Sequence, residues 1–194
     1  MTFPDVYLYD FSNDTHSVDE LRQLLGEQRY EYCRQMKSAK AGLSSAFAFL
    51  LLRYALKKHS GITEIPELVI GEHGKPYLKD YPDIFFNMSH SDTRVICAVS
   101  DSPVGVDIQD IRKITPSAAK KFLTDEELKS CDLSDISGLC RIWCIKESYG
   151  KLTGKGFAEG FGSFSAGSLI SDGRARCIER DGFFISICIR EVIM

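Results

Sequence analysis

The sequence lacks any long apolar run. Its longest strongly apolar stretch, residues 46–52, ends at Arg53. A transmembrane helix needs about 20 consecutive apolar residues, so we expect no membrane-spanning segment. A positively charged and then apolar N-terminal segment of the signal-peptide kind is also missing. We therefore expect a cytoplasmic protein with no membrane partner.

The sequence also lacks a large excess of charge of one sign. Its formal net charge is -3 at pH 7, and its isoelectric point is about 5.8. Proteins that bind nucleic acid broadly need a basic face to neutralise phosphates. The composition therefore gives no support for a nucleic-acid partner. It leaves room for a local basic pocket that holds a phosphorylated small molecule.

Clustered metal-ligand motifs of the zinc type are absent. The closest pair of cysteines is Cys140 and Cys144, which are four residues apart with no neighbouring His and no second close pair. The number of cysteines, seven, is odd, which does not suggest a framework of disulfides. We interpret them as reduced thiols, most of them buried in the core.

Apolar periodicity and turn residues predict an α+β fold. Helices are expected at residues 18–37, 41–59 and 136–152. Strands are expected at residues 6–11, 67–70, 84–86, 94–99, 104–108, 161–170, 174–179 and 183–189. The order of strand, helices and further strands occurs twice. We therefore predict two pseudo-symmetric halves, residues 1–102 and 103–194, with a ligand cleft between them.

The first segment that suggests chemistry is residues 105–109, Gly-Val-Asp-Ile-Gln. Side chains alternate along a strand, so Val106 and Ile108 point to one face while Asp107 and Gln109 point to the other. The apolar pair would enter a core and the polar pair would face a cleft. By itself the pattern is more typical of an ordinary strand with one solvated face than of a functional site.

The second segment is residues 143–151, which lie in the predicted helix 136–152. Trp143, Glu147 and Lys151 are spaced by four residues and share one stripe of that helix. Such a Glu–Lys pair often lies on a solvated surface. The presence of the one Trp of the chain on the same stripe favours a partly buried position instead.

Two further segments carry polar groups beside predicted strands. Residues 87–91 read Asn-Met-Ser-His-Ser, and residues 74–76 read Gly-Lys-Pro. The Gly-x-Ser-x-Gly elbow of serine hydrolases is not present around Ser89, Ser163 or Ser165. A Gly-Lys-Pro turn is common in loops, but it can also place an ammonium group beside an anionic or planar ligand.

Together and in this order, the four segments resemble the long-form, surfactin-synthetase-activating type of 4′-phosphopantetheinyl transferase. That family carries Gly-Lys-Pro, Asn-x-Ser-His-Ser, Gly-(Val/Ile)-Asp-Ile-Glu and Trp-(Ser/Cys)-x-Lys-Glu-(Ser/Ala)-x-x-Lys. The resemblance implies transfer of the phosphopantetheine arm of coenzyme A to a serine of an apo-acyl or peptidyl carrier protein, with release of 3′,5′-ADP. It also implies Mg²⁺ as the cofactor and, for a two-halved chain, a monomer.

The resemblance assigns roles to individual residues of this chain. Asp107 and Glu147 would bind the metal, with Gln109 where many relatives have a third carboxylate. Glu147, Lys151 and Asp107 would be catalytic: Glu147, or a water held by the metal, as the base for the acceptor hydroxyl, and Lys151 as the contact to phosphate. Lys146 points about a quarter-turn away on the helix and is a weaker candidate.

The same resemblance predicts the coenzyme A contacts, which are Lys75, Pro76, Ser89, His90, Arg29 and Arg34. The competing interpretation is a non-catalytic coenzyme A or nucleotide binder that lost turnover through Gln109. A third interpretation is a protein-interaction scaffold, in which Asp107 and Glu147 would be dispensable.

Overall fold

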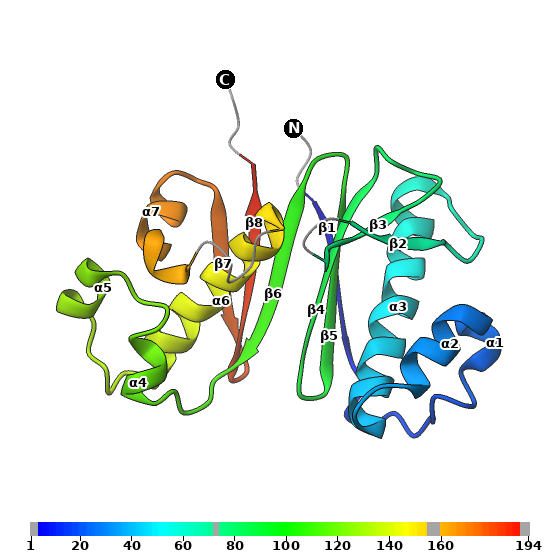
Figure 1. Cartoon of the computed structure of the whole chain (residues 1–194), viewed down its shortest axis with the longest axis horizontal. Helices are drawn as coiled ribbons and strands as arrows, with labels where there is room; N and C mark the ends of the chain where they lie inside the picture. Colours follow the sequence, from blue (N-terminus) through cyan, green and yellow to red (C-terminus); the bar gives the residue numbers. More distant parts are fainter. Residues whose placement is uncertain (1–3, 72–73, 155–159, 191–194) are drawn as a thin grey trace.

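The structure of the chain is a computed structural model that describes residues 4–71, 74–154 and 160–190. It contains two long helices and two three-stranded antiparallel sheets, so the predicted α+β class is confirmed. Figure 1 shows the long helix of each half lying against the sheet of that half. The two sheets meet in the middle of the molecule.

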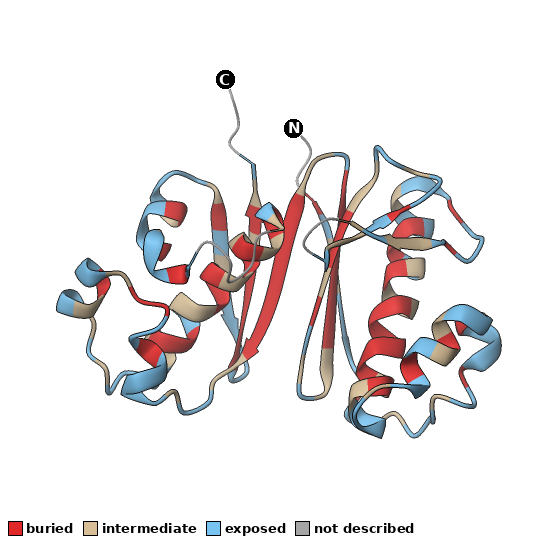
Figure 2. Ribbon diagram, in the orientation of Figure 1, coloured by how far each residue is buried: buried red, intermediate tan, exposed pale blue. Residues whose placement is uncertain are grey.

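The first sheet has the order β1-β5-β4 and consists of β1 (Asp5–Asp10), β5 (Arg94–Ser100) and β4 (Phe85–Ser91). Its covering helix is α3 (Ala39–Ser60). The Ser38 side chain accepts a hydrogen bond from the Ala41 amide at the start of α3, and Gly61 ends the helix in a left-handed conformation. Figure 2 shows that the sheet-facing side of α3 is buried.

The second sheet has the order β6-β8-β7 and consists of β6 (Val104–Asp110), β8 (Phe183–Ile189) and β7 (Ala175–Arg180). Its covering helix is α6 (Ile136–Thr153), which ends at Gly154. The β7–β8 hairpin turns at Asp181-Gly182. Asp135 caps the start of α6 by accepting from the Gly138 amide.

Strand alternation divides the apolar residues between three core layers. On β5, Val95, Cys97 and Val99 face α3, whereas Ile96 and Ala98 face the second sheet. On β6 and β8 the apolar faces meet Ile96 and Ala98 between the sheets, through Val104, Val106, Ile108, Phe183 and Ile185. The predicted alternation of residues 105–109 is therefore correct. Asp107 and Gln109 face the α6 side of the sheet.

Gly105 allows α6 to pack directly on β6. A Cβ atom at this position would lie 2.0 Å from the Ser148 carbonyl oxygen and 2.5 Å from the Leu152 amide nitrogen. Any larger residue would push the helix away from the strand. The glycine therefore sets the distance between the strand that carries Asp107 and the helix that carries Glu147 and Lys151.

Shorter elements complete the molecule. In the first half they are α1 (Arg22–Leu25), α2 (Glu27–Arg34), β2 (Leu68–Ile70) and β3 (Pro76–Leu78). In the second half they are α4 (Pro116–Ala119), α5 (Asp125–Ser130), the 3₁₀ helix η3 (Phe161–Ser163) and α7 (Ala166–Ser171). A capping box of Thr124 and Glu127 starts α5.

Three predicted elements are wrong in detail. The helix expected at 18–37 is shorter and is broken at Gly26, whose φ of 73° does not fit a helix. The strand expected at 161–170 is instead η3 and α7, because the Ser165 side chain caps α7 by accepting from the Gly167 and Ser168 amides. The strand expected to end at residue 86 continues as β4 to Ser91.

Helix α3 is long and apolar enough to cross a bilayer by length and composition alone. In the structure it is the core helix of the first half, and 56% of its most apolar window is buried inside the protein. The division of the chain at residues 102 and 103 stays a prediction. That point falls in the turn between β5 and β6.

Candidate active site

Asp107 lies on β6 where that strand adjoins β4 of the first sheet, and its side chain is buried. The Ser89 hydroxyl on β4 donates a 2.7 Å hydrogen bond to Asp107 Oδ1. Nearby along the same two strands, the Val106 amide donates to Asn87 Oδ1 at 2.9 Å. Side chains of β4 thus bind β6 and hold Asp107 at the junction of the two halves.

Lys151 reaches this junction from α6. Its ammonium group lies 2.6 Å from Asp107 Oδ1 and 2.7 Å from Ser89 Oγ. The lysine side chain is 28% exposed and the aspartate side chain 7%, so the ion pair is partly screened by solvent. The three residues form a cluster. Asp107 comes from β6, Lys151 from α6 and Ser89 from β4 of the first sheet.

Glu147 lies one turn before Lys151 on the same stripe of α6. Burial and the negative charge of Asp107 raise the pKa of the Glu147 carboxyl to about 7, against the lowering effect of Lys151. A carboxyl with a pKa near neutrality can accept a proton from a hydroxyl and then release it. A cation bound near Glu147 would also relieve the repulsion between its carboxylate and that of Asp107.

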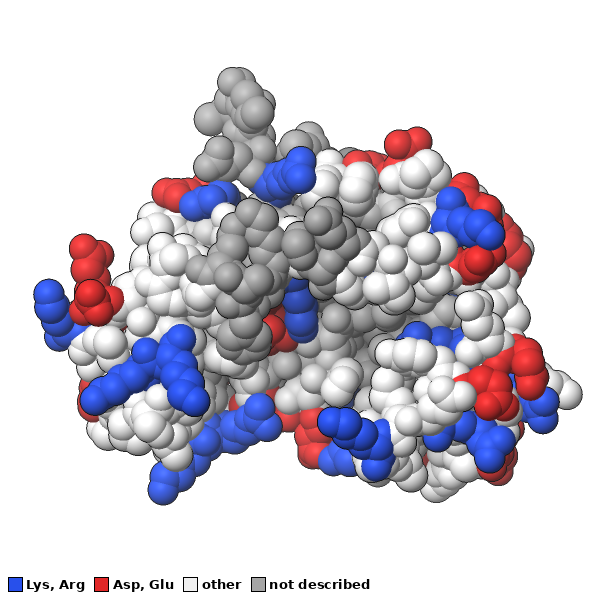
Figure 3. Space-filling model, viewed as in Figure 1, with Lys and Arg blue, Asp and Glu red and all other residues white. Residues whose placement is uncertain are grey.

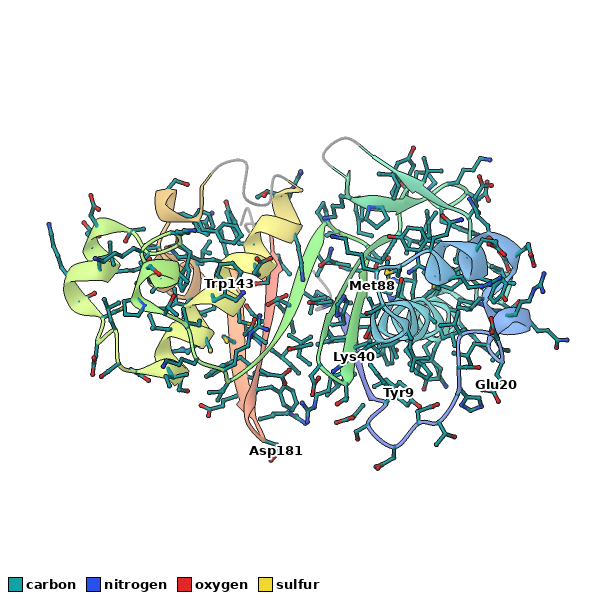
Figure 4. The ribbon with its side chains drawn as sticks, turned by 60° about the horizontal axis from the view of Figure 1, so that its bottom comes forward. Tyr9, Glu20, Lys40, Met88, Trp143 and Asp181 are labelled. Atoms are coloured by element: carbon teal, nitrogen blue, oxygen red, sulfur yellow. The ribbon has the colours of Figure 1, made fainter. Side chains whose placement is uncertain are left out.

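These residues line a cavity of about 510 Å³, which we call the carboxylate cleft. Its walls come from β4, β6 and α6, together with the connection after β6. They consist of Met88, Ser89, His90, Ser91, Asp92, Asp107, Ile108, Gln109, Arg112, Trp143, Glu147 and Lys151. Figure 4 shows the labelled Trp143 and Met88 on opposite sides of β6. The predicted metal and catalytic residues therefore line one cavity, with the two halves on either side of it.

Gln109 and His90 both line the carboxylate cleft. The amide nitrogen of Gln109 donates to the Asp110 carbonyl at 2.8 Å, which leaves its amide oxygen as the atom able to approach a cation. Burial lowers the pKa of His90, and Lys151 lowers it further, against the opposing effect of Asp107. His90 also lines an adjoining cavity of about 560 Å³, with Lys40, Ser44 and Arg112. The imidazole therefore connects two polar cavities.

Pro76 and Arg29 line a third cavity of about 410 Å³, which we call the apolar pocket. Its wall also includes Phe49, Ile65 and Met88, and Met88 is shared with the carboxylate cleft. The Arg29 guanidinium donates to Ser45 Oγ at 2.7 Å and lies over the Phe49 ring. Pro76 and Arg29 therefore line one cavity, which is different from that of the carboxylates.

Lys75 and Arg34 occupy positions that the sequence does not predict. The Lys75 ammonium donates to the carbonyls of Val104 and Leu152, at the start of β6 and near the end of α6. Burial lowers its pKa to about 8, with a further contribution from Arg190. Arg34 lies over the Tyr30 ring and within 4.0 Å of Asp19 and Glu31. It lines none of these three cavities.

Lys146 has a structural role in this geometry. Its side chain is fully buried and donates to Glu127 Oε2 at 2.6 Å and to the carbonyls of Phe122 and Phe161. The other Glu127 oxygen accepts from the Ala166 amide. Lys146 thus fastens α6 to α5, η3 and α7, behind the ring of Trp143, which packs against Phe122 and Phe161.

Comparison with known proteins agrees with this geometry. The family model of the 4′-phosphopantetheinyl transferase superfamily matches residues 103–191. A 4′-phosphopantetheinyl transferase of Bacillus subtilis is 29% identical over 169 residues, which is 84% of this chain and 75% of the relative. The 4′-phosphopantetheinyl transferase gsp of Aneurinibacillus migulanus is 33% identical over 159 residues, 78% of this chain and 65% of the relative.

A third relative is the 4′-phosphopantetheinyl transferase psf-1 of Bacillus pumilus. It is 39% identical over 108 residues, which is 53% of this chain and 46% of the relative. The chain thus spans between about half and three quarters of the length of these relatives. The matched family region contains β6 and α6, which carry Asp107, Glu147 and Lys151. We conclude that the chain belongs to the 4′-phosphopantetheinyl transferase superfamily.

Proposed function

We propose that this protein transfers the 4′-phosphopantetheine group of coenzyme A to a serine hydroxyl of an apo-carrier protein and releases 3′,5′-ADP. The observation that carries the proposal is the convergence of Asp107, Glu147 and Lys151 in the carboxylate cleft. Transfer from a pyrophosphate needs positive charge at the phosphates and a base for the attacking hydroxyl. In the cleft, Lys151 supplies positive charge and Glu147 can serve as the base, and the two residues lie one turn apart on α6.

The residues of the chain divide this work between them. Lys151 is a cation already held at the cleft by Asp107 and Ser89, so it can contact a phosphate oxygen with little loss of conformational entropy. Glu147 is the group placed to take the proton of the acceptor serine, because its pKa of about 7 lets it bind and release a proton near neutral pH.

We propose Mg²⁺ as the cofactor of this site. Mg²⁺ prefers carboxylate, carbonyl and water oxygens, and Asp107, Glu147 and the amide oxygen of Gln109 are donors of that kind. When bound, the ion neutralises negative charge on the pyrophosphate. Among the described residues, no three Asp, Glu, His or Cys side chains converge as a metal site. We therefore expect weak Mg²⁺ binding to the free protein and tighter binding with coenzyme A present, which calorimetric titration in both conditions would measure.

The apolar pocket lies in the first half, and it could hold the part of coenzyme A that lies outside the carboxylate cleft. Arg29 at its wall provides a cation, and Pro76 and Phe49 provide apolar surface for a planar group. Met88 joins this pocket to the carboxylate cleft, so one extended ligand could occupy both. A non-catalytic coenzyme A binder would use the same pockets but would not need Glu147.

The deciding experiment is a mass-shift assay. A panel of apo-acyl and apo-peptidyl carrier proteins is incubated with coenzyme A, Mg²⁺ and the protein, and each carrier is weighed by mass spectrometry. We expect at least one carrier to gain the phosphopantetheine arm, and we expect Asp107→Ala and Glu147→Ala to abolish the gain with the fold retained. Coenzyme A binding without transfer to any carrier would support the non-catalytic binder instead.

A further inference from the structure

Cysteine side chains gather behind the carboxylate cleft, on the elements that shape it. Cys144 on α6 and Cys188 on β8 are buried in two different groups of core residues. Cys177 on β7 packs against both of these groups. Cys144 Sγ lies 3.6 Å from the carbonyl oxygen of Asp107 and 3.6 Å from that of Phe184. The thiol of Cys144 therefore touches the backbone of the residue that the proposed function places at the centre of the site.

Accessibility separates the cysteines into two groups. Cys33, Cys97, Cys140, Cys144 and Cys188 are buried, whereas Cys131 and Cys177 are partly exposed. Cys177 lies on β7, an edge strand of the second sheet. Its side chain packs against the core group that contains Cys144, and Cys144 and Arg141 lower the pKa of its thiol. Cys177 thus combines access from solvent with a place against the core group that contains the thiol of Cys144.

We propose that Cys144 and Cys177 are an oxidative modification site, where a peroxide closes a reversible disulfide between α6 and β7. In the first step the Cys177 sulfur attacks a peroxide oxygen, the O–O bond breaks, and a sulfenic acid forms as hydroxide leaves. In the second step the Cys144 sulfur attacks that of Cys177. The S–S bond forms and the S–O bond breaks, releasing water. The two thiols are oxidised, and hydrogen peroxide is reduced to two molecules of water.

The register of the sheet favours this pair over the alternative with Cys188. Cys177 lies opposite Ser186, and Cys188 lies opposite Ala175, so Cys177 and Cys188 are diagonal neighbours on adjacent strands. Diagonal neighbours are about 7–8 Å apart and their Cβ atoms somewhat less, whereas a disulfide needs a Cβ–Cβ distance of about 3.5–4.5 Å.

Closing the disulfide would act on the carboxylate cleft through Cys144. An S–S bond is about 2.05 Å long, so the two sulfurs must move together when it forms. Cys144 then loses its S–H donor and its contact with the Asp107 carbonyl. Because Glu147 follows Cys144 by three residues on α6, a shift of the helix also moves the carboxyl group. Displacements of about 1 Å can lower a rate by up to about 100-fold.

The test is peroxide treatment of the full chain, followed by proteolysis and mass spectrometry without reductant. We expect the wild type to lose two hydrogen atoms and yield a linked pair of peptides that contain Cys144 and Cys177. Cys177→Ser should yield no such pair, while Cys131→Ser, which removes the other partly exposed thiol, should behave as the wild type does. A disulfide between other cysteines, or oxidation of Cys177 to sulfinic acid without a crosslink, would overturn the proposal.

The effect on activity rests on the proposed transfer and is measured separately. Oxidised wild type should transfer phosphopantetheine about 10- to 100-fold more slowly, and dithiothreitol should restore the rate. Cys177→Ser should keep its rate through the same treatment. If the reduced protein modifies no carrier, the proposed function fails while the peptide map still decides the disulfide. A crosslinked protein with an undiminished rate would overturn the link between the disulfide and the cleft.

Discussion

Two lysines on α6 show how burial decides the role of a residue. Lys146 is fully buried among carbonyls and Glu127, whereas Lys151 is partly exposed in the carboxylate cleft. We predict that Lys146→Met lowers the free energy of unfolding by about 3–5 kcal/mol, because it leaves Glu127 buried without its charge partner. Lys151→Met should cost less, about 1–2 kcal/mol, because solvent can hydrate Asp107 once the lysine is removed.

Chemical denaturation of both variants, with transfer assayed at a temperature where both are folded, distinguishes the two roles. Lys146→Met should retain measurable transfer while it is folded, because its ammonium group does not line the cleft. Lys151→Met should be folded and inactive. Equal losses of stability in the two variants would contradict this assignment.

Glu147 makes stability depend on pH in a direction that can be measured. Its folded-state pKa of about 7 lies above the ordinary value of 4.5, so the folded state holds the proton more tightly than the unfolded state. Stability should therefore fall as pH rises from about 4.5 to 7. We predict that Glu147→Gln removes this fall and raises the free energy of unfolding at pH 8 by roughly 1–3 kcal/mol.

Urea denaturation at pH 5 and pH 8 without divalent cations measures this effect. Glu147→Gln should at the same time lose transfer by about 100-fold or more, the usual contribution of a general base. The variant would thus be more stable and less active. A variant that follows the pH profile of the wild type would show that Glu147 has an ordinary pKa.

For single residues, the sequence predicts the position of a functional side chain well when that residue lies in a regular helix or strand pattern. The stripe of Trp143, Glu147 and Lys151 and the alternation around Asp107 both place side chains correctly, because helix and strand geometry fix side-chain direction. Lys75 could not be placed in the same way. Its ammonium group binds the carbonyls of Val104 and Leu152, which are distant in sequence, and no local pattern encodes that contact.

At the scale of elements, the contact between β6 and α6 determines the shape of the site. We predict that Gly105→Ala destabilises the protein by about 2–4 kcal/mol and lowers transfer at least 10-fold. The added methyl group would lie 2.0 Å from the Ser148 carbonyl, and the helix that carries Glu147 would have to move. Thermal unfolding and the mass-shift assay would measure the two effects.

The matched control is Gly167→Ala in α7. There the new Cβ atom meets nothing closer than Ser165 Oγ at 3.4 Å, and alanine favours a helix over glycine. We expect Gly167→Ala to be neutral or slightly stabilising and fully active. A Gly105→Ala protein as stable as this control would mean that α6 and β6 can separate without cost.

The elements that the sequence misassigns fail for identifiable reasons. Residues 161–170 combine aromatic and small residues in a way that favours a strand, but Ser165 caps a helix and Phe161 packs against Trp143. Residues 87–91 are polar and read as a loop. They form a strand because Asn87, Ser89 and Ser91 find partners on β6 rather than in solvent. Partners supplied by the tertiary structure thus override local preference.

At the scale of the whole molecule, the site depends on both sheets. Ser89 belongs to the first sheet and Asp107 to the second, and their hydrogen bond crosses the junction. Arg94 on β5 strengthens it by pairing with Asp10 at 3.0 Å and with Asp110 at 3.0 Å. The resemblance to a two-halved family predicts a cleft between the halves. The individual bonds that close the junction could not be deduced from the sequence.

Charge on the surface suggests how a protein acceptor would approach. Arg112 lines the carboxylate cleft, and it is exposed together with Lys113, Lys120 and Lys121; we call these four residues the basic rim. Figure 3 shows Lys and Arg side chains gathered over α4 and along the lower edge of this face. The protein as a whole is acidic, so this rim is a local exception. An acceptor whose serine enters the cleft must pass close to Arg112.

We predict that reversing the charge of Lys120 and Lys121 to Glu lowers kcat/KM for an acidic carrier protein about 10-fold at low salt, and that the difference shrinks as salt screens the rim. The KM for coenzyme A should not change, because neither lysine lines a cavity described above. The same reversal of Lys57 and Lys58, at the far end of α3, changes net charge equally and is the matched control. If both double variants lose activity alike, overall charge rather than the basic rim governs the encounter. If only the reversal at Lys120 and Lys121 acts, the carrier docks on the second half, beside Glu147.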